Sequence, residues 1–467
     1  EISACLVGSE MCIRDRYITM CMALLSSCHI YRNYQRPEGL PVDSLFQNRY
    51  DSRAEDSLTL GDMPWQEIFR DTLLQDLILY GLENNTDMQT VMLRVDQAKA
   101  QLKAARLSFL PSLTLSPQGT LTGTDGHKAV KTYELPIQAS WEIDLLGSLR
   151  NAKKGVQATL LEQKAYQQAV RSELIATIAN DYFSLLLLDE QLRISQATLE
   201  IWREQIRTME SKFKVGEETE NAITQARASL YELEATHNDL QRQQREAENA
   251  LCTLLGTTSQ SIRRGCLKQQ DFPEQFNVGI PSRLLSKRPD VVQAEMTLAN
   301  AYYATNQARS AFYPNLTLTG STGWTNSLGQ TVTNPGGWIL SAVASLTQPI
   351  FNRGKLISNL RVSKDEEQIA LLAYKQTLLD AGQEVNDGLY ATESIKRSLD
   401  NHLKQCNELE RTVQTSEALY LTGNATYLEL LTARQSLLNA QLGVVSDKFT
   451  YCQSVINLYN ALGGGCE

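Results

Sequence analysis

Residues 105–115 read Ala-Arg-Leu-Ser-Phe-Leu-Pro-Ser-Leu-Thr-Leu, and residues 308–318 read Ala-Arg-Ser-Ala-Phe-Tyr-Pro-Asn-Leu-Thr-Leu. The same pattern therefore occurs twice, at an offset of 203 residues. Further along the chain the offset becomes 207, as between Gly147 and Gly354. The chain is an internal duplication of two units of about 200 residues, and four residues are inserted between Pro314 and Gly354.

Each unit begins with a predicted helix and a predicted β-hairpin. In the first unit, residues 67–108 carry an apolar face at helical spacing, which ends at Pro111 because proline lacks the amide donor. The sequence Asn84-Asn85-Thr86-Asp87 is expected to break this helix and to cap its second half. Residues 132–143 then alternate apolar and polar side chains, as an amphipathic strand does, and Leu113 and Leu115 begin its partner. The second unit repeats this alternation at Leu316, Leu318, Trp338, Leu340, Ala342, Ala344 and Leu346.

Two long helices are predicted after the hairpins. Residues 148–212 contain no proline and one glycine, and residues 355–420 repeat the pattern with two glycines. The first helix would be roughly 95 Å long at 1.5 Å per residue. Both helices are expected to end near a glycine, Gly216 or Gly423, and to be followed by another helical run. Helices of this length favour a coiled-coil-like wall.

The composition excludes several classes of protein. The chain has 467 residues, of which 42% are hydrophobic and 21% charged, and its formal net charge is −9. A nucleic-acid partner is not expected, because such proteins usually carry a basic face. No stretch after residue 30 holds 18 consecutive apolar residues, so helical membrane spans are not expected, whereas strand spans remain open.

The chemistry-bearing residues point to no enzyme. The sequence contains no P-loop, GxSxG or HExxH motif, and no Cys or His spacing that suits a metal site. We therefore expect no catalytic residues, no metal and no cofactor. Cys252 and Cys266 are near enough in sequence to form a disulfide in an exported protein, but spacing alone leaves that pairing open.

The beginning of the chain predicts an exported lipoprotein. Residues 17–25 form a short apolar stretch behind two arginines, and the sequence Leu25-Ser-Ser-Cys28 resembles a bacterial lipobox. We expect cleavage before Cys28 and lipidation of its thiol; the alternative is a chance cysteine after small residues. Residues 1–16 have no initiating Met and resemble translated adapter sequence, so they are left out of the fold prediction.

The predicted strands require a barrel that one chain cannot close. Two hairpins give four strands of roughly 8–12 residues, a length that suits a tilted span of a bilayer. Open sheet edges are not tolerated in lipid, so other copies must complete the barrel. Two copies would give eight strands and a filled interior, and three would give twelve and a lumen. The alternatives are a soluble hairpin beside a helical bundle and a lipid-anchored periplasmic coiled-coil scaffold.

Several short motifs follow one another in a fixed order. They are Tyr34-Gln-Arg-Pro37, Trp65, Ala105-Arg106 before Pro111, Trp141-Glu-Ile-Asp144 with Gly147, Arg288-Pro-Asp290, Gln348-Pro-Ile-Phe351 with Gly354, and Leu458-Tyr-Asn-Ala-Leu-Gly-Gly-Gly465. In this order they resemble the TolC-like outer-membrane efflux proteins, in particular the lipoprotein branch that works with resistance-nodulation-division pumps. Cys466 departs from the pattern, because this branch commonly has an aromatic residue there.

The resemblance implies an α+β membrane protein built from a duplicated helix–hairpin–long-helix–helix unit. Three copies would complete a twelve-stranded β-barrel in the outer membrane, joined to a periplasmic α-helical barrel. The homotrimer would passively export small toxic molecules that an inner-membrane pump and a periplasmic adaptor pass to it. The expected divisions are a leader and signal peptide (1–27), a lipid-anchored segment (28–60), a first efflux repeat (61–270) and a second (271–467).

The two helix-to-helix turns are candidate docking sites. Glycine takes a left-handed helix cap at little steric cost, so Gly216 and Gly423, followed by Thr219 and Thr426, should form the periplasmic tips. By resemblance these tips dock the adaptor; the alternative is a helix-end glycine with no partner role. Asp144, Gly147 and Gly354 are expected at the strand-to-helix junctions.

A candidate gate follows the second tip. The resembling family has a leucine there, followed four residues later by an aspartate; this chain has Leu428 and Thr432, so the acidic ring is in doubt. Spacing of four places both on one helix face, where three copies could ring the pore. Alternatively, Leu428 packs between helices. Glu429 and Arg434 are nearby and could serve subunit contacts.

Overall fold

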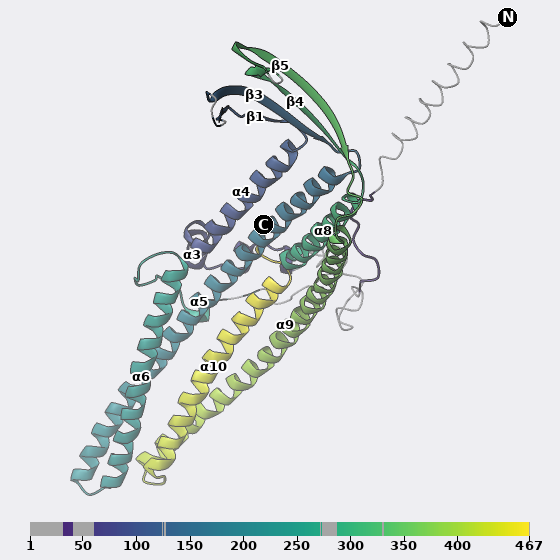
Figure 1. Cartoon of the computed structure of the whole chain (residues 1–467). Coiled ribbons are helices and arrows are strands. Elements are labelled where there is room, and N and C mark those ends of the chain that lie inside the picture. The colour runs from purple at the N-terminus through teal and green to yellow at the C-terminus, as the bar shows by residue number, and fades with distance from the viewer. Residues whose placement is uncertain are drawn as a thin grey trace, which may run out of the picture. The chain divides into compact units, whose positions relative to one another are not determined.

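The computed structural model describes residues 31–40, residues 60–270 except 124, 126 and 127, residue 272, and residues 287–466 except 329 and 330. The predicted leader, the signal peptide and Cys28 lie outside these residues. Within them the chain is a largely helical α+β protein with one antiparallel sheet (Figure 1). None of the described helices combines the length and the apolar character needed to cross a membrane.

The elements follow the predicted duplicated order. The first repeat contains η2 (Leu60–Asp62), α2 (Trp65–Ile68), α3 (Thr72–Asn84), α4 (Thr86–Leu107), β1 (Ser112–Leu115), β2 (Gln118–Thr122), β3 (Val130–Ile143), α5 (Ser148–Lys214), α6 (Glu220–Leu254) and η3 (Leu267–Gln269). The second contains α8 (Pro289–Ser310), β4 (Asn315–Leu328), β5 (Thr331–Thr347), α9 (Lys355–Leu421) and α10 (Tyr427–Ala461). Helices α5 and α9 each have 67 residues, and α6 and α10 each have 35, so the duplication extends to element length.

The predicted first helix is interrupted twice. Asn85 separates α3 from α4, and its side-chain oxygen accepts a hydrogen bond from the Met88 amide at 2.9 Å. A second interruption, which the apolar periodicity does not reveal, separates α2 from α3. There the Asp71 carboxylate caps α3 by accepting from the Leu73 amide at 3.0 Å, so a local capping bond competes with continuation of the helix.

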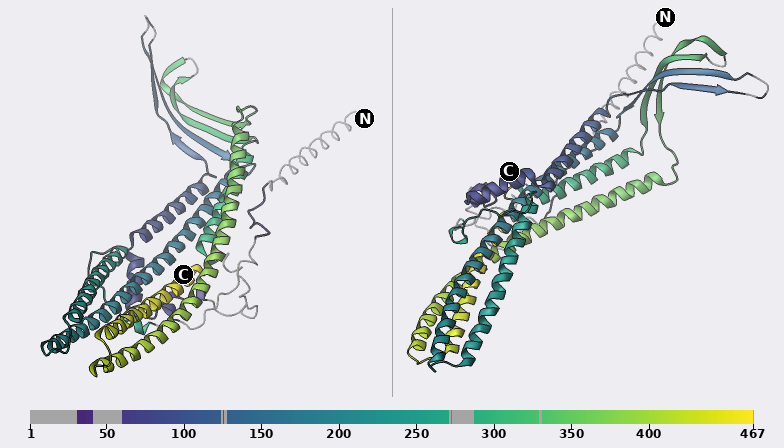
Figure 2. Two further views of the ribbon diagram at one scale, coloured as in Figure 1. Left: turned by 90° about the horizontal axis from the view of Figure 1, so that it is seen from below. Right: turned by 90° about the vertical axis from the view of Figure 1, so that its left-hand side faces the viewer.

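The described residues form two compact units, and the sheet belongs to the first, which includes residues 94–164 and 293–375. Strand order is β1–β3–β4–β5, with β2 also paired to β3. The strands of this sheet lie side by side in both views of Figure 2. The strand expected from Leu113 is thus divided into β1 and β2, because Pro117 between them has no amide to donate. The register continues across the gap, from Leu115 opposite Ile137 to Gln118 opposite Glu134, so β1 and β2 serve as one strand.

The two hairpins have the same register. Ser112 pairs with Ser140, and their counterparts at offsets 203 and 207, Asn315 and Thr347, also pair. The agreement continues to Thr122 with Val130 and to Thr325 with Gly337. The four inserted residues therefore lie between Thr325 and Gly337, at the loop end of the second hairpin.

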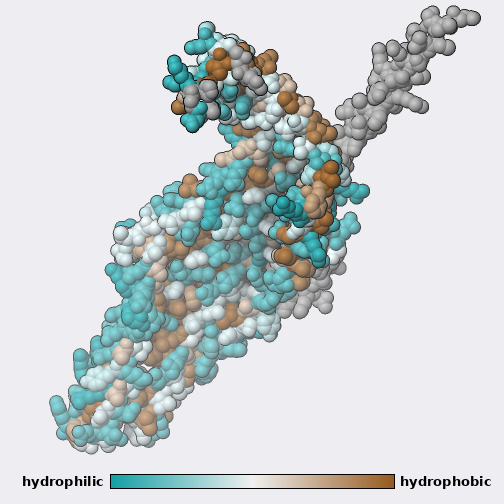
Figure 3. Space-filling model, in the orientation of Figure 1, coloured by the Kyte–Doolittle hydropathy of each residue, from teal (hydrophilic) through white to brown (hydrophobic). Residues whose placement is uncertain are grey.

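A pairing between the hairpins joins them into one sheet. Strands β3 and β4 pair from Glu134 opposite Thr325 to Ile143 opposite Leu316. Most of the alternating apolar side chains predicted from the sequence are exposed, among them Leu135 and Leu340, while Leu316 and Leu318 are half-buried. Exposed apolar side chains also lie among polar ones along the helices and strands in Figure 3. Strands with one exposed apolar face are typical of proteins in which that face contacts lipid.

The second compact unit, which includes residues 60–93, 165–270 and 376–466, holds most of the buried apolar side chains. Leu74, Ile78, Tyr182 and Leu251 are fully buried and belong to one core cluster. The Tyr182 hydroxyl donates to the Asp71 carboxylate at 2.6 Å and accepts from the Gly265 amide at 2.8 Å. Helix α5 is therefore fastened both to the start of α3 and to the segment after α6.

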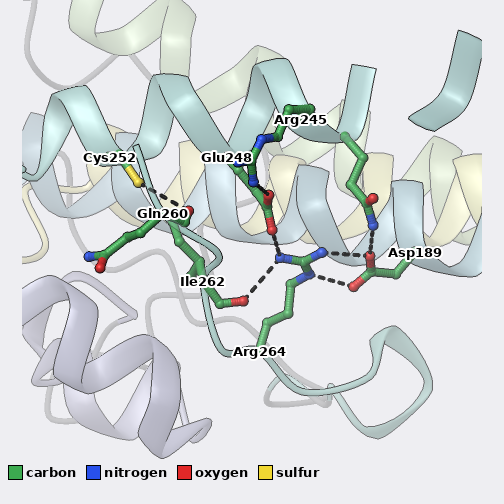
Figure 4. Close-up of polar contacts among 8 residues, drawn as sticks. Asp189, Arg245, Glu248, Cys252, Gln260, Ile262 and Arg264 are labelled. Carbon is green, nitrogen blue, oxygen red and sulfur yellow. Dashed lines mark hydrogen bonds and ion pairs between the residues drawn. The ribbon is translucent and has the colours of Figure 1, made fainter. Parts of the chain in front are cut away.

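An arginine cluster fastens the segment that follows α6 (Figure 4). The Arg264 guanidinium donates to Asp189 on α5 at 2.5 and 2.9 Å and to Glu248 on α6 at 2.7 Å. Burial alone would raise the pKa of Glu248, but the bonds from Arg264 and Arg245 outweigh it and lower that pKa. The cluster is a desolvated charge network that joins three segments.

The cysteine pair left open by the sequence is not bridged. Cys252 is buried and its thiol lies 3.5 Å from the Gln260 carbonyl oxygen, while Cys266 is exposed. Both are free cysteines.

Replacing Arg264 by Ala should destabilise the second unit by about 3 kcal/mol, because Glu248 is left buried without its main partner. The measurement is the free energy of unfolding from urea titration in detergent, followed by far-ultraviolet circular dichroism. Arg242→Ala is the matched control, since Arg242 makes only exposed pairs with Asp239 and Glu246 and should change nothing measurable. Equal effects of both variants would contradict the role given to Arg264.

Acid should weaken the same network. The pKa of the Glu248 carboxyl is lower in the folded protein than in the unfolded chain. The ionised Glu248 therefore stabilises the fold at a pH above its unfolded pKa, and this stabilisation is lost as the pH falls through its folded pKa.

Candidate functional site

Two helix-to-helix turns of the second unit are built alike. Gly216 has φ +80° and Gly423 has φ +76°, the left-handed conformation that disfavours other residues. In the first turn the Glu217 amide donates to the Lys212 carbonyl at 3.0 Å; in the second the Asn424 amide donates to the Leu419 carbonyl at 2.9 Å. Both turns are thus Schellman-type caps. A Cβ at either glycine would meet nothing within 4 Å, so backbone conformation, not space, requires glycine.

The next helix in each pair begins at a threonine cap. The Thr219 hydroxyl accepts from the Ala222 amide at 3.3 Å. The Thr426 hydroxyl accepts from the Glu429 amide at 3.4 Å, and the Glu429 carboxylate accepts from the Thr426 amide at 3.0 Å, which completes a capping box. The tip glycines and threonines expected from the sequence therefore lie together in each turn.

An ion pair braces each helical hairpin above its turn. Arg227 on α6 pairs with Glu210 on α5 at 2.6 Å, and Arg434 on α10 pairs with Glu417 on α9 at 3.1 Å. The two braces are related by the offset of 207. Glu429 caps its own helix and Arg434 pairs within its own hairpin, and the expected subunit contacts of both stay a prediction.

A contact between the two turns was not predicted. The Tyr420 hydroxyl on α9 donates to the Glu218 carboxylate of the first turn at 2.6 Å. Lys212 lies 4.6 Å from the centre of the Tyr420 ring, and the Tyr427 ring lies 6.0 Å from it, edge to face. Burial, and then the bond to Glu218, raise the pKa of Tyr420, so the hydroxyl remains a donor.

The signal for this contact lies in the difference between repeats. The counterparts of Tyr420 and Tyr427 in the first repeat are Phe213 and Glu220, so only the second hairpin carries a phenol at the first of these positions. Comparison of the duplicated halves, rather than either half alone, singles out Tyr420.

The candidate gate residues lie on the first turns of α10. Leu428 is 63% exposed, whereas Tyr427, Leu430 and Leu431 are buried. Thr432 is exposed, and its hydroxyl donates to the Leu428 carbonyl at 2.8 Å. Leu428 therefore does not pack between the helices of its own chain, and both candidates share one open face.

The junction residues lie in the first unit, between strand and helix. The Asp144 carboxylate accepts from the Leu149 amide at 3.2 Å and the Arg150 amide at 3.0 Å, and so caps the start of α5. Gly147 and Gly354 have φ +82° and +77°. The position of Asp144 is taken by Phe351 in the second repeat, where the side chain is 85% exposed.

The described part of the chain contains no group of three or more His, Cys, Asp or Glu side chains placed to hold a metal ion. What it offers is a pair of capped, linked helical hairpins in one unit and an open-edged amphipathic sheet in the other. Comparisons with known proteins show the class of protein to which such parts belong.

The family model described as "Outer membrane efflux protein" matches residues 78–257 and 280–464. The "Cation efflux system protein CusC" of Escherichia coli O157:H7 is 30% identical over 466 residues, 97% of this chain and 99% of that protein. The "Probable outer membrane lipoprotein SilC" of Salmonella typhimurium is 28% identical over 449 residues, 95% of this chain and 96% of that protein. A crystal structure of CusC superimposes with a TM-score of 0.84 at 27% identity, covering 93% of this chain and 99% of that one.

The chain belongs to the outer membrane efflux protein family. The resemblance seen in the sequence is thereby confirmed, and with it the α+β channel fold. The protein is the outer-membrane channel of a tripartite efflux system and extends into the periplasm. It works as a homotrimer with a periplasmic adaptor and an inner-membrane resistance-nodulation-division pump.

Proposed function

We propose that this channel is a passive duct whose closed end is formed by the two linked tips and by Leu428. The observation that carries the proposal is an exposed leucine directly after a capped turn, on a helix where Tyr427, Leu430 and Leu431 are buried. An apolar side chain held open on a braced helix suits a ring formed with other copies. Thr432, one turn further along, adds a weak polar ring in place of an acidic one.

The tips centred on Gly216 and Gly423, with caps Thr219 and Thr426, are the proposed docking sites for the adaptor. Their support is rigidity: each turn combines a left-handed glycine, a threonine cap and an ion-pair brace. The Tyr420–Glu218 bond holds one tip against the other. A partner that contacts both tips would therefore act on the constriction.

The proposed organisation keeps the divisions expected from the sequence: 1–27, 28–60, 61–270 and 271–467. Cys28 is the proposed site of lipidation, supported by its lipobox-like context and by the description of the relative SilC as a probable lipoprotein. Asp144, Gly147 and Gly354 are proposed to turn the chain from strand to helix at the membrane boundary. Catalysis has no part in the proposal, because the sequence carries no catalytic motif.

The proposed cargo is small toxic molecules handed on by the pump, and the relative CusC is named for a cation efflux system. Deletion of the gene, followed by growth on soft metal cations, dyes, detergents and antibiotics, tests this function. Sensitivity to at least one compound, restored by the intact gene, is expected. Unchanged resistance to the whole panel, with the pump and adaptor expressed, would contradict it.

Replacing both tip glycines by leucine should abolish export and leave trimers in the outer membrane. A side chain at positive φ strains each turn and displaces the docking surface. The measurements are resistance in the complemented deletion strain and an unheated gel for trimers. Gly443→Leu is the matched control, because Gly443 lies within α10 and does not have a positive φ. A Cβ at Gly443 would meet nothing within 4 Å outside the backbone of its own helix. Full export by the double variant would argue against docking there.

Leu428→Gly should raise the single-channel conductance in planar bilayers and admit a large antibiotic such as vancomycin, because the apolar ring is removed. The matched control is Asn221→Gly, since Asn221 occupies the same position in the first repeat. It should leave conductance unchanged. Normal conductance of Leu428→Gly at normal trimer level would place the constriction elsewhere.

A further inference from the structure

The sheet of one chain has two open edges. Among the described residues, β5 pairs only with β4, and β1 and β2 pair only with β3. Unpaired strand edges are not tolerated in a bilayer, so each edge must meet another copy in the trimer. The edge strands are also the first strand of the first repeat and the last strand of the second.

The chain already contains one joint of this kind. The β3–β4 pairing joins the last strand of one repeat to the first strand of the next, with Glu134 opposite Thr325. Both hairpins share one register under the offsets 203 and 207, so the offsets can be applied along these strands. The counterpart of Glu134 on β5 is Ser341, and the counterpart of Thr325 on β2 is Thr122.

We propose that the β3–β4 register is repeated between subunits, so that Ser341 of one copy lies opposite Thr122 of the partner subunit. The proposal rests on the homotrimer and adds the residue-level joint. Antiparallel continuation then places Ser345 opposite Gln118 of the partner subunit and Ala342 opposite Leu121 of the partner subunit.

The side-chain pattern agrees with this register and excludes a register shifted by one residue. Leu121 and Ala342 both belong to the apolar alternation, while Gln118 and Ser345 both belong to the polar one. The joint therefore continues one apolar and one polar face around the ring. A slip of one residue would move Leu121 opposite Ser341 and put the two faces out of step.

The helices beneath the strands extend the same argument. Within the chain α5 lies against α8: a Cβ at Gly155 would be 3.0 Å from the Asn300 side chain, and Lys154 lies 5.7 Å from the centre of the Tyr303 ring. The counterpart of Gly155 on α9 is Val362, and that of Asn300 on α4 is Gln97, whose side chain is exposed. Helix α9 should therefore pack against α4 of the partner subunit, with Val362 near Gln97 of the partner subunit.

The open face of α9 fits this partner. Ile357, Val362, Ile369 and Leu372 are 69%, 50%, 65% and 64% exposed. Their counterparts on α5 are Arg150, Gly155, Glu162 and Ala165, so the second repeat carries the more apolar set. Such a row of exposed apolar side chains on a long helix is typical of an interface.

Disulfide trapping tests the register. Residues opposite one another on paired strands have Cα atoms roughly 4.5–5.5 Å apart, a spacing that a disulfide can bridge. The double variant Ser345→Cys/Gln118→Cys should give covalent trimers on a heated non-reducing gel, which become monomers with reductant. The single variants control for the native cysteines. The slipped pair Ser345→Cys/Thr120→Cys lies diagonally and should stay monomeric.

The outcomes separate register from assembly. Unheated trimers without a covalent link in Ser345→Cys/Gln118→Cys overturn the register, and so does efficient linking of the slipped pair. Absence of unheated trimers in the unmodified chain overturns the assembly on which the proposal rests. If the strand variants do not assemble, Val362→Cys/Gln97→Cys tests the same joint outside the sheet, and trimers that fail to link there count against it.

Discussion

The requirement that every backbone amide and carbonyl be paired in the lipid phase governs this molecule. One chain satisfies it along β3 and β4 but leaves β1, β2 and β5 with open edges. A chain with such edges cannot be a finished membrane protein on its own, so association belongs to the fold. Duplication supplies an economical solution, because a joint that works once between repeats can be used again between copies.

The second constraint is reversal of the long helices. After each 67-residue helix the chain reverses direction within a short turn. In both turns a glycine at positive φ ends the long helix and a threonine caps the next one. Glycine at positive φ also stands at the two strand-to-helix junctions, where Gly147 and Gly354 precede α5 and α9. Features required by the backbone are therefore common to both repeats, with their spacing preserved.

The sequence predicted the elements whose cause is local or periodic. Period-two alternation located β3, proline-free helical spacing located α5 and α9, and glycine located the turns. It did not predict the division of β1 from β2 at Pro117, because a single missing donor leaves no periodic trace. Nor did it predict the Arg264 cluster or the Tyr420–Glu218 bond, since both join side chains brought together only by tertiary packing.

Divergence between the repeats marks what the backbone does not demand. Asp144 caps α5, the helix that follows β3, an inner strand of the sheet. Its counterpart Phe351 is exposed where β5, an edge strand, leads into α9. Phe213 has the counterpart Tyr420, which links the tips, and Asn221 has the counterpart Leu428, which stands open on α10. Since the two halves share one fold, packing within a half cannot account for these differences. The two halves meet different neighbours, so these positions are candidates for contacts between hairpins and between copies.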